Sequence, residues 1–314
     1  MFKKIISLIM ALAFAVNLHA IVGYGVSEEQ GFRPTMEDTY TIHEEGYDKV
    51  YVVFDGHGGS EVSKFASEKL HLYILKNKNF FSNNIVMAIK EGFAKTDNEM
   101  KDANLLGGSC AITALINENE KEKKLYVANI GDCRAVLSRD GKVVALSRDH
   151  KASDKKEKER VKKAGGEVKE GRVIEHLPND MVRRLAVSRA FGDFSRKDKG
   201  IISEPEIFVH NLDEKDEFLI LASDGVWDVL SNESAVNIVR NALLERKDLN
   251  FASNELLFKA LFSDSKDNIT VMIIQFKDAF EDRVEHYCAM VDEEIKLPLS
   301  GKRKFAMSKK EKEE

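Results

Sequence analysis

The sequence predicts an α+β fold in which antiparallel β-sheets carry helices on their outer faces. Predicted segments come in blocks, with a helix pair, a run of strands, a second helix pair and a final strand. A parallel sheet would instead alternate strand and helix regularly. No linker rich in Pro, Gly or Ser interrupts residues 22–277 of the 314-residue chain. We therefore expect one main domain over residues 21–278.

Three apolar runs have the length and composition of buried strands, and each adjoins an acid. Residues 50–54 run into Asp55, residues 217–223 run into Asp224, and residues 269–274 follow Asp267. Alternating or apolar stretches predict the remaining strands at residues 21–40 (a strand and turn), 110–116, 125–130, 133–137, 143–146 and 207–209. Asp140-Gly141 predicts a tight hairpin turn before residues 143–146, because both residues tolerate positive φ angles.

Apolar residues at helical spacing predict a helix over residues 60–76, with Ser60 as its N-cap, and a second over residues 84–102. Helices are also expected at residues 232–246 and 251–262. Residues 152–163 are heavily charged and are followed by Gly165-Gly166, which predicts an exposed helix with a glycine stop. We interpret the charges of that segment as a solvated face.

Composition limits the classes of function. Hydrophobic residues make up 43% of the chain and charged residues 32%, as in a soluble globular protein. The net charge of -5 gives no reason to expect nucleic-acid binding, which usually requires a concentrated basic face. Three cysteines, an odd number, imply no disulfide framework. A core of ordinary size is expected to stabilise the fold.

The two ends of the chain differ from its middle. Lys3 and Lys4 precede a short apolar stretch, residues 5–16, so residues 1–20 read as a secretory signal peptide. Cleavage would give a secreted, periplasmic or secretory-pathway protein without stable membrane insertion. The alternatives are an uncleaved membrane anchor, a buried N-terminal helix or a cytoplasmic protein. Residues 279–314 read as a charged extension that is partly disordered.

Acids at strand ends predict a metal centre. A buried carboxylate is costly unless a cation compensates it, and the three apolar runs contain no Lys or Arg. Oxygen-only donors suit Mg²⁺ or Mn²⁺ rather than Zn²⁺ or copper. Six carboxylates exceed what one Mg²⁺ normally takes, which favours two or more ions. The acids in these contexts are Glu37, Asp55, Asp132, Asp224, Asp228 and Asp267.

Two further residues suit displacement at phosphorus, the reaction that two-ion sites commonly promote with a bridging water. Arg33, four residues before Glu37, offers a planar guanidinium for the phosphate oxygens. His57, two residues after Asp55, is placed to protonate a leaving oxygen. Gly56, between Asp55 and His57, allows close backbone approach and a free carbonyl near an ion.

The chain resembles the type-2C, metal-dependent (PPM) serine/threonine protein phosphatases. The matching stretches appear in the family's order and span nearly all of residues 22–277. They are Arg33-Pro34-Thr35-Met36-Glu37-Asp38, Phe54-Asp55-Gly56-His57-Gly58-Gly59, Gly108-Ser109-Cys110-Ala111, Asn129-Ile130-Gly131-Asp132-Cys133-Arg134, Leu185-Ala186-Val187-Ser188-Arg189-Ala190-Phe191-Gly192-Asp193, Ala222-Ser223-Asp224-Gly225-Val226-Trp227-Asp228 and Asp267-Asn268-Ile269-Thr270-Val271.

The resemblance implies a four-layer α-β-β-α sandwich with a small flap subdomain and two Mn²⁺ or Mg²⁺ ions. It implies that Asp55 bridges both ions, that Glu37 and the Gly56 carbonyl complete one ion, and that Asp224 and Asp267 hold the other. Asp38 would orient a water at the ions. Arg33 would grip the phosphate, and His57 would be the general acid. Asp132 and Asp228 match positions that hold a weaker third ion in some relatives. Relatives are often monomeric, so the resemblance also implies a monomer.

The implied activity is hydrolysis of phosphoserine and phosphothreonine in proteins by a water that bridges the two ions. Cys110 stands where the family usually has Thr, and Cys133 where Ser is common. Residues 174–184 lengthen the flap region beyond the usual pattern. Two alternatives stay open: a pseudophosphatase that binds phosphoproteins or a regulatory partner, and a two-metal phosphodiesterase or nuclease.

Overall fold

The computed structural model describes residues 23–46, 48–117, 123–245 and 248–276. The predicted leader, residues 1–20, and the C-terminal extension, residues 279–314, lie outside the described residues and stay predictions. Among the described residues, no helix is both long and apolar enough to cross a membrane.

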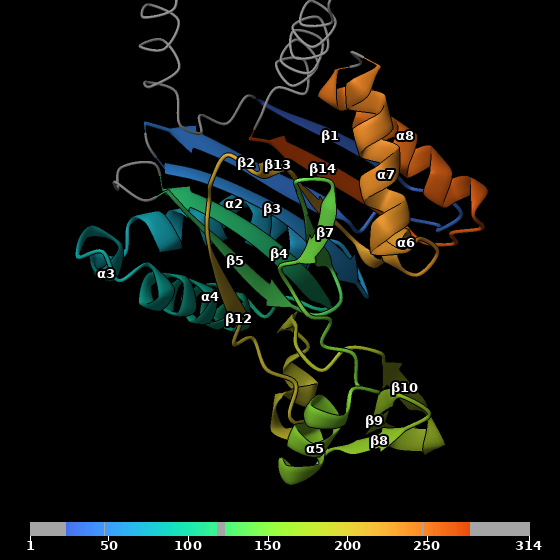
Figure 1. Cartoon of the computed structure of the whole chain (residues 1–314). Helices are drawn as coiled ribbons and strands as arrows, with labels where there is room; N and C mark the ends of the chain where they lie inside the picture. Colours follow the sequence, from blue (N-terminus) through green and yellow to red (C-terminus); the bar gives the residue numbers. More distant parts are fainter. Residues whose placement is uncertain (1–22, 47, 118–122, 246–247, 277–314) are drawn as a thin grey trace, which may run out of the picture. The chain divides into compact units, whose positions relative to one another are not determined.

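Two antiparallel sheets form the centre of the fold (Figure 1). The five-stranded sheet has the order β1-β14-β13-β6-β7, and the second sheet has the order β12-β5-β4-β3-β2 with the short β11 paired to β4. Their strands are β1 (Gly23–Glu29), β2 (Thr39–Glu45), β3 (Asp48–His57), β4 (Gly108–Asn117), β5 (Lys124–Ile130), β6 (Arg134–Arg139), β7 (Lys142–Ala145), β11 (Phe191–Gly192), β12 (Glu206–Asn211), β13 (Asp216–Ala222) and β14 (Ile269–Gln275).

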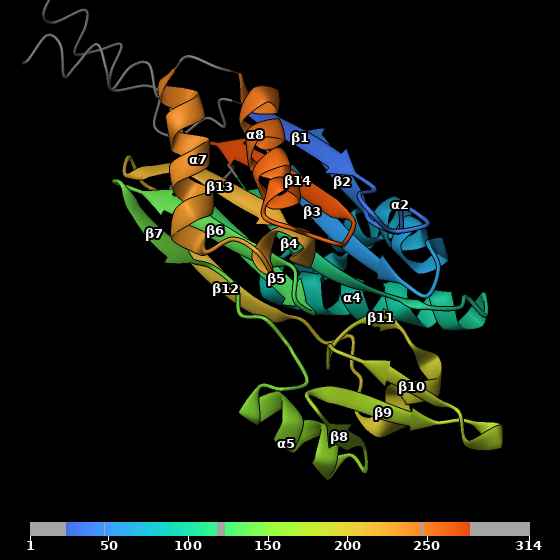
Figure 2. The ribbon, with the colours of Figure 1, turned by 90° about the vertical axis from the view of Figure 1, so that its right-hand side faces the viewer.

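Helices cover the outer face of each sheet, which completes the predicted four-layer sandwich (Figures 1 and 2). On the sheet that contains β3 they are α2 (Glu61–Leu75), α3 (Lys78–Phe81) and α4 (Ile85–Asp102). On the sheet that contains β14 they are α7 (Asn232–Leu244) and α8 (Leu249–Phe262), with the short α6 (Asp224–Trp227) at the end of β13. The short α3 was not predicted. Ser60 is the N-cap of α2 as predicted, but its side chain makes no capping hydrogen bond.

The strand β3 shows why the apolar run of residues 50–54 carries no charged position. Tyr51 and Val53 lie in the core between the two sheets, whereas Val50, Val52 and Phe54 lie in the core beneath α2 and α4. Successive side chains of a strand point to opposite faces, and here both faces are buried. By the same alternation, Asp55 follows on the side of Tyr51 and Val53, at the point where the strand ends.

A smaller unit, which we call the flap (residues 148–205), lies between β7 and β12 in the sequence (Figure 2). It contains α5 (Lys155–Lys163), a three-stranded sheet of β8 (Glu167–Lys169), β9 (Arg172–His176) and β10 (Val182–Leu185), the turns η1 (Pro178–Asp180) and η2 (Phe194–Lys199), and β11. The added residues 174–184 therefore form most of the β9–β10 hairpin. The predicted Asp140-Gly141 turn is confirmed, with φ angles of 48° and 75°.

The charged helix α5 has the predicted solvated face, to which exposed residues such as Lys155, Glu159 and Lys163 belong. Its other side is buried, because Glu157 is only 2% exposed and Val161 is fully buried. Glu157 accepts hydrogen bonds from Arg160 (2.7 Å), Arg189 (2.8 Å) and Ser188 (2.7 Å). A carboxylate is buried at this cost only when it is paired and hydrogen-bonded, so the charged helix is anchored through a charged residue.

Candidate active site

The acids converge because antiparallel pairing brings the relevant strand ends to one edge of the sandwich. In the first sheet β13 ends at Ala222, opposite Val271 near the start of β14, so Asp224 and Asp267 lie at the same end. In the second sheet Thr39 at the start of β2 pairs with Phe54, which brings Glu37 and Asp38 beside Asp55. The connection from β5 to β6 adds Asp132.

Asp55 lies at the centre of this group. Burial, and then the negative charges of Asp224, Asp38, Asp132 and Asp267, raise the pKa of Asp55 well above its usual range. Burial also raises the pKa of Asp224, followed by the charges of Asp132 and Asp267. Like charges that repel one another in this way are the electrostatic signature of a site completed by cations.

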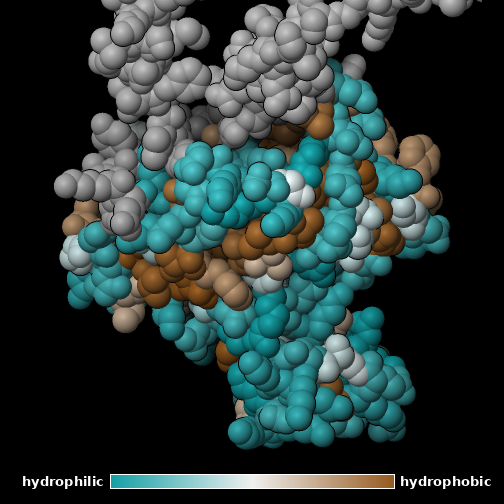
Figure 3. All heavy atoms as spheres, viewed as in Figure 1, coloured by the Kyte–Doolittle hydropathy of each residue, from teal (hydrophilic) through white to brown (hydrophobic). Residues whose placement is uncertain are grey.

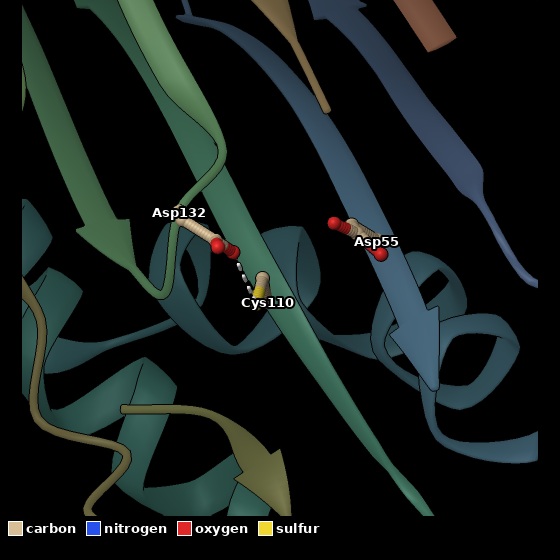
Figure 4. A group of neighbouring side chains, drawn as sticks. All are labelled: Asp55, Cys110 and Asp132. Atoms are coloured by element: carbon tan, nitrogen blue, oxygen red, sulfur yellow. Dashed lines mark hydrogen bonds between the residues drawn. The ribbon is translucent and has the colours of Figure 1, made fainter. Parts of the chain in front are cut away.

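Figure 4 shows the closest part of the cluster. Asp55 and Cys110 are directly opposite each other on β3 and β4, and Asp132 follows β5. The Cys110 Sγ–Asp132 Oδ1 distance is 3.5 Å, and the ligand atoms of Asp55, Cys110 and Asp132 all lie within 4.8 Å of one another. Burial, and then the charges of Asp132 and Asp55, raise the pKa of the Cys110 thiol well above its usual range. The thiol is therefore kept neutral beside the carboxylates.

Asp38 is buried beneath this edge. Thr270 donates to Asp38 Oδ2 at 3.0 Å. Burial raises the pKa of Asp38 to about 7, and hydrogen bonds from Ser223 and Thr270 oppose that rise. Asp38 is thus held by hydroxyl groups rather than by a cation. This is an environment in which a carboxyl group can exchange a proton near neutral pH.

Glu37 is fixed mainly through its backbone. Its N–H donates to Asn268 Oδ1 at 2.8 Å, and its side chain accepts from the Gly59 N–H at 3.1 Å. The amide of Asn268 also donates to the carbonyl oxygens of Gln30 (2.8 Å) and Thr35 (3.0 Å). Asn268 therefore ties the loop before β2 to the start of β14. Asn268 lies within one of the family motifs, but no role was predicted for it from the sequence.

Two cationic groups lie at the edge of the acid cluster. Arg33 Nη2 lies 2.5 Å from Asp267 Oδ2, and its side chain is 52% exposed. Lys151 Nζ lies 2.7 Å from Asp228 Oδ1 and 3.8 Å from Asp132 Oδ2. Lys151 therefore joins the two acids matched to a third ion, although no sequence argument pointed to it. Asp228 itself is exposed.

His57 stands beside the acids but bonds to the flap. Its Nε2 lies 2.7 Å from Asp193 Oδ2, and Asp193 is almost completely buried. Arg196 donates to the other oxygen of Asp193. Burial by itself would raise the pKa of Asp193, but the hydrogen bond and charge of His57 and the charge of Arg196 outweigh it and lower the pKa. Asp193 lies at the end of one of the family motifs, but no role was predicted for it from the sequence.

The donor set fits the predicted ions. Carboxylates converge at one edge, and no described His lies in the closest group of possible ligands. Burial, followed by the charges of nearby acids, raises the pKa of the Cys110 and Cys133 thiols well above the usual range, so both are neutral. Hard oxygen donors of this kind suit Mg²⁺ or Mn²⁺. The structure brings the predicted acids to one sandwich edge, with His57 and Arg33 at its border.

Comparison with known proteins supports the resemblance found in the sequence. A family model described as "Protein phosphatase 2C" matches residues 22–269. The chain is 37% identical over 283 residues to "Protein phosphatase 2C homolog 2" of Hypocrea jecorina, covering 81% of this chain and 62% of that protein. It is 34% identical to "Probable protein phosphatase 2C 6" of Paramecium tetraurelia, covering 82% of this chain and 93% of that protein.

A solved structure shares the fold. The "serine-threonine phosphatase 2C from Toxoplasma gondii" aligns with a TM-score of 0.70 at 22% identity, over 82% of this chain and 98% of that one. The chain spans less than two thirds of the length of the Hypocrea relative and of an Arabidopsis thaliana relative, "Probable protein phosphatase 2C 25". The family model covers well over half of the chain, and the strand-end acids lie within it. The chain belongs to the protein phosphatase 2C family.

Proposed function

We propose that the protein hydrolyses phosphoserine and phosphothreonine in other proteins, in a reaction that requires two Mn²⁺ or Mg²⁺ ions. The observation that carries this proposal is the convergence of Asp55 with four other carboxylates, whose charges raise its pKa. Family membership supports the same activity.

The ions would be held by side chains from both sheets. Asp55 would bridge them, Glu37 and the Gly56 carbonyl would complete one, and Asp224 with Asp267 would complete the other. Asp132 and Asp228 would hold a weaker third ion, in competition with the ammonium of Lys151. When bound, two such ions supply Lewis acidity for the phosphate and activate a bridging water.

The chain's own groups would supply binding and proton transfer. Arg33 has a half-exposed guanidinium, so it can hold phosphate oxygens while still bonded to Asp267. Asp38, which accepts a hydrogen bond from Thr270, would orient the attacking water. His57 would donate a proton to the departing serine or threonine oxygen, which is a poor leaving group without it.

The test is metal-dependent turnover by the purified chain. We expect phosphate release from a phosphothreonine peptide with Mn²⁺ or Mg²⁺, and none after EDTA treatment. Metal-independent turnover would contradict the proposal. Tight phosphopeptide binding without turnover at saturating Mn²⁺ would identify a pseudophosphatase instead. Faster hydrolysis of bis(p-nitrophenyl) phosphate than of the monoester would identify a phosphodiesterase.

A further inference from the structure

We propose that Asp193 is a positioning residue for His57, and that it connects the acid group of the site to the flap sheet. This inference rests on the proposed function, because it takes His57 as the group that protonates the departing oxygen. It adds a residue and a connection to which the sequence motifs gave no role.

The hydrogen bond decides which ring nitrogen is available. Asp193 Oδ2 lies 2.7 Å from His57 Nε2, and the carboxylate is 2% exposed against 29% for the imidazole. An ionised carboxylate can only accept a hydrogen bond, so Asp193 keeps a proton on His57 Nε2 and fixes the orientation of the imidazole ring. Nδ1 makes no hydrogen bond to any residue that the structure describes. Nδ1 is therefore the nitrogen left to pass a proton to a substrate.

The backbone of Gly108 lies against the contact between His57 and Asp193, and there is no space for a side chain at this position. Gly108 pairs with His57 on one side and with Gly192 on the other. A Cβ atom at Gly108 would lie 2.3 Å from Asp193 Oδ2 and 2.4 Å from His57 Nε2. Any side chain at this position would push the two groups apart. A glycine here keeps the path between imidazole and carboxylate clear.

The side chain of Asp193 contacts His57 and does not cap the turn η2, which begins directly after it. Asp193 has a φ of 49°, in the left-handed region that Asp and Asn adopt more readily than other side chains. It occupies the N-cap of η2, yet its side chain makes no capping hydrogen bond. One oxygen meets His57 and the other accepts from Arg196. Both oxygens are thus committed to charged or ionisable side chains.

The connection continues into the flap. Arg196 Nη2 lies 2.9 Å from Glu175 Oε2, and both side chains are about nine-tenths buried. Glu175 belongs to β9 and lies within residues 174–184, the segment that lengthens the flap. A line of side chains therefore runs from His57 through Asp193 and Arg196 to β9. A substrate that displaces β9 would change the orientation of the imidazole through these contacts.

The test compares leaving groups rather than overall rates. A proton donor matters most when the leaving oxygen is strongly basic, so phenyl phosphate needs it more than p-nitrophenyl phosphate. Neither substrate is a peptide, which excludes peptide contacts with the flap. We expect Asp193→Asn, which suits the left-handed backbone, to lower kcat/KM ~10- to 100-fold for phenyl phosphate and a phosphothreonine peptide. The rate for p-nitrophenyl phosphate should change much less.

A second variant, Gly108→Ala, disturbs the contact between His57 and Asp193 without changing either residue. Gly108→Ala should separate His57 from Asp193 while only side-chain ends have to move. We expect it to shift the ratio of the two rates in the same direction as Asp193→Asn. It also supplies the test if Asp193→Asn does not fold. Glu175→Gln should give a smaller shift of the same sign.

Asp97 is the matched control. It supports the same loop, because it accepts from the Gly192 N–H (2.8 Å) and Ser203 Oγ (2.9 Å) and pairs with Lys197 (2.8 Å), yet no contact with His57 is present. Asp97→Asn should lower stability and leave the ratio of the two rates unchanged. In a His57→Gln background, Asp193→Asn should have no further effect on that ratio.

The outcomes separate the two proposals. If wild type lacks metal-dependent turnover of every substrate, the proposed function fails and the inference fails with it. If wild type is active but both folded variants lower the two rates equally, Asp193 is structural and only the inference is overturned. The same conclusion follows if Asp97→Asn shifts the ratio as much as Asp193→Asn does.

Discussion

The sandwich and the flap bury different kinds of side chain. In the sandwich, strands such as β3 and β14 are buried on both faces, and the two cores consist of aliphatic and aromatic residues. The flap contributes apolar residues such as Val161, Val173 and Ile201 to one of these cores, but it also buries the charged residues Glu157, Glu175, Asp193 and Arg196. On the face shown in Figure 3 the surface of the flap is mostly hydrophilic, and hydrophobic residues gather over the sandwich.

This difference in buried side chains indicates that the sandwich and the flap are stabilised in different ways. Apolar burial is non-directional and stabilises the sandwich as one cooperative unit. Buried ion pairs depend on geometry, and breaking one leaves an uncompensated charge. The predicted metal ligands lie on the sandwich edge, whereas Asp193, the partner of His57, lies in the flap. The candidate site thus joins carboxylates of the sandwich edge to His57, the proposed proton donor, whose partner Asp193 in the flap is held by charge pairing.

The largest expected effect comes from the sandwich edge. Asp55→Asn should lower phosphatase activity by roughly 10²-fold or more, because it removes the central charge for the ions. The same change should leave the melting temperature in EDTA unchanged or raised, since burial and like charges disfavour ionised Asp55. Rate assays and thermal unfolding with and without Mn²⁺ measure both effects. Near-normal activity and metal binding would show that Asp55 does not bridge the ions.

Next comes the charged anchor of the flap. Glu157→Gln leaves Arg160 and Arg189 without their shared carboxylate, and removal of one partner from a buried pair costs about 3–5 kcal/mol. We expect faster amide hydrogen exchange in α5 and in β8 to β10, with β3 and β14 still protected. Lys163→Gln, on the same helix but exposed, is the control and should behave as wild type. Equal deprotection of β3 would mean that flap and sandwich unfold together.

Removal of divalent ions should destabilise the wild-type protein, whereas Asp55→Asn is expected to leave its stability in EDTA unchanged or raised. Ions that bind only the folded state add about 2.7 kcal/mol at a concentration 100 times Kd. Chelation should therefore lower the melting temperature of wild type but have little effect on Asp55→Asn. Calorimetry with Mn²⁺ and with EDTA makes the comparison. An equal loss in both proteins would place the stabilising ions elsewhere.

The smallest effect concerns acid pH and the flap. Burial by itself would raise the pKa of Glu157, but hydrogen bonds from Arg189, Arg160 and Ser188 outweigh it, and the pKa lies well below its ordinary value of 4.5. The stability this provides is present above about pH 4.5 and is lost as the pH falls toward the lowered pKa. Limited proteolysis at pH 7 and pH 4 should show earlier cleavage in the flap at pH 4. Unchanged flap protection would show that Glu157 is not its main anchor.

Much of the sandwich and of the acid cluster could be predicted because local composition encodes them. Most buried positions of β3 and β14 are apolar, with Thr270 and Gln275 of β14 as exceptions, and an acid that adjoins such a run has few places to lie. Helices α2 and α4 were predicted within a residue or two, since their apolar spacing is unambiguous. The family motifs then ordered the acids Glu37, Asp55 and Asp224 along the chain.

The sequence alone determined the α+β class and the acids beside the strand ends, because these depend on residue type and on nearest neighbours. Tertiary structure decided that Asp193 meets His57 across 136 positions and that Lys151 meets Asp228 across 77. It also decided that Glu157 is buried in a helix whose other residues are mostly charged. Such contacts are set by how the flap folds against the sandwich, and a charged side chain has the same local signature whether it faces solvent or a distant partner.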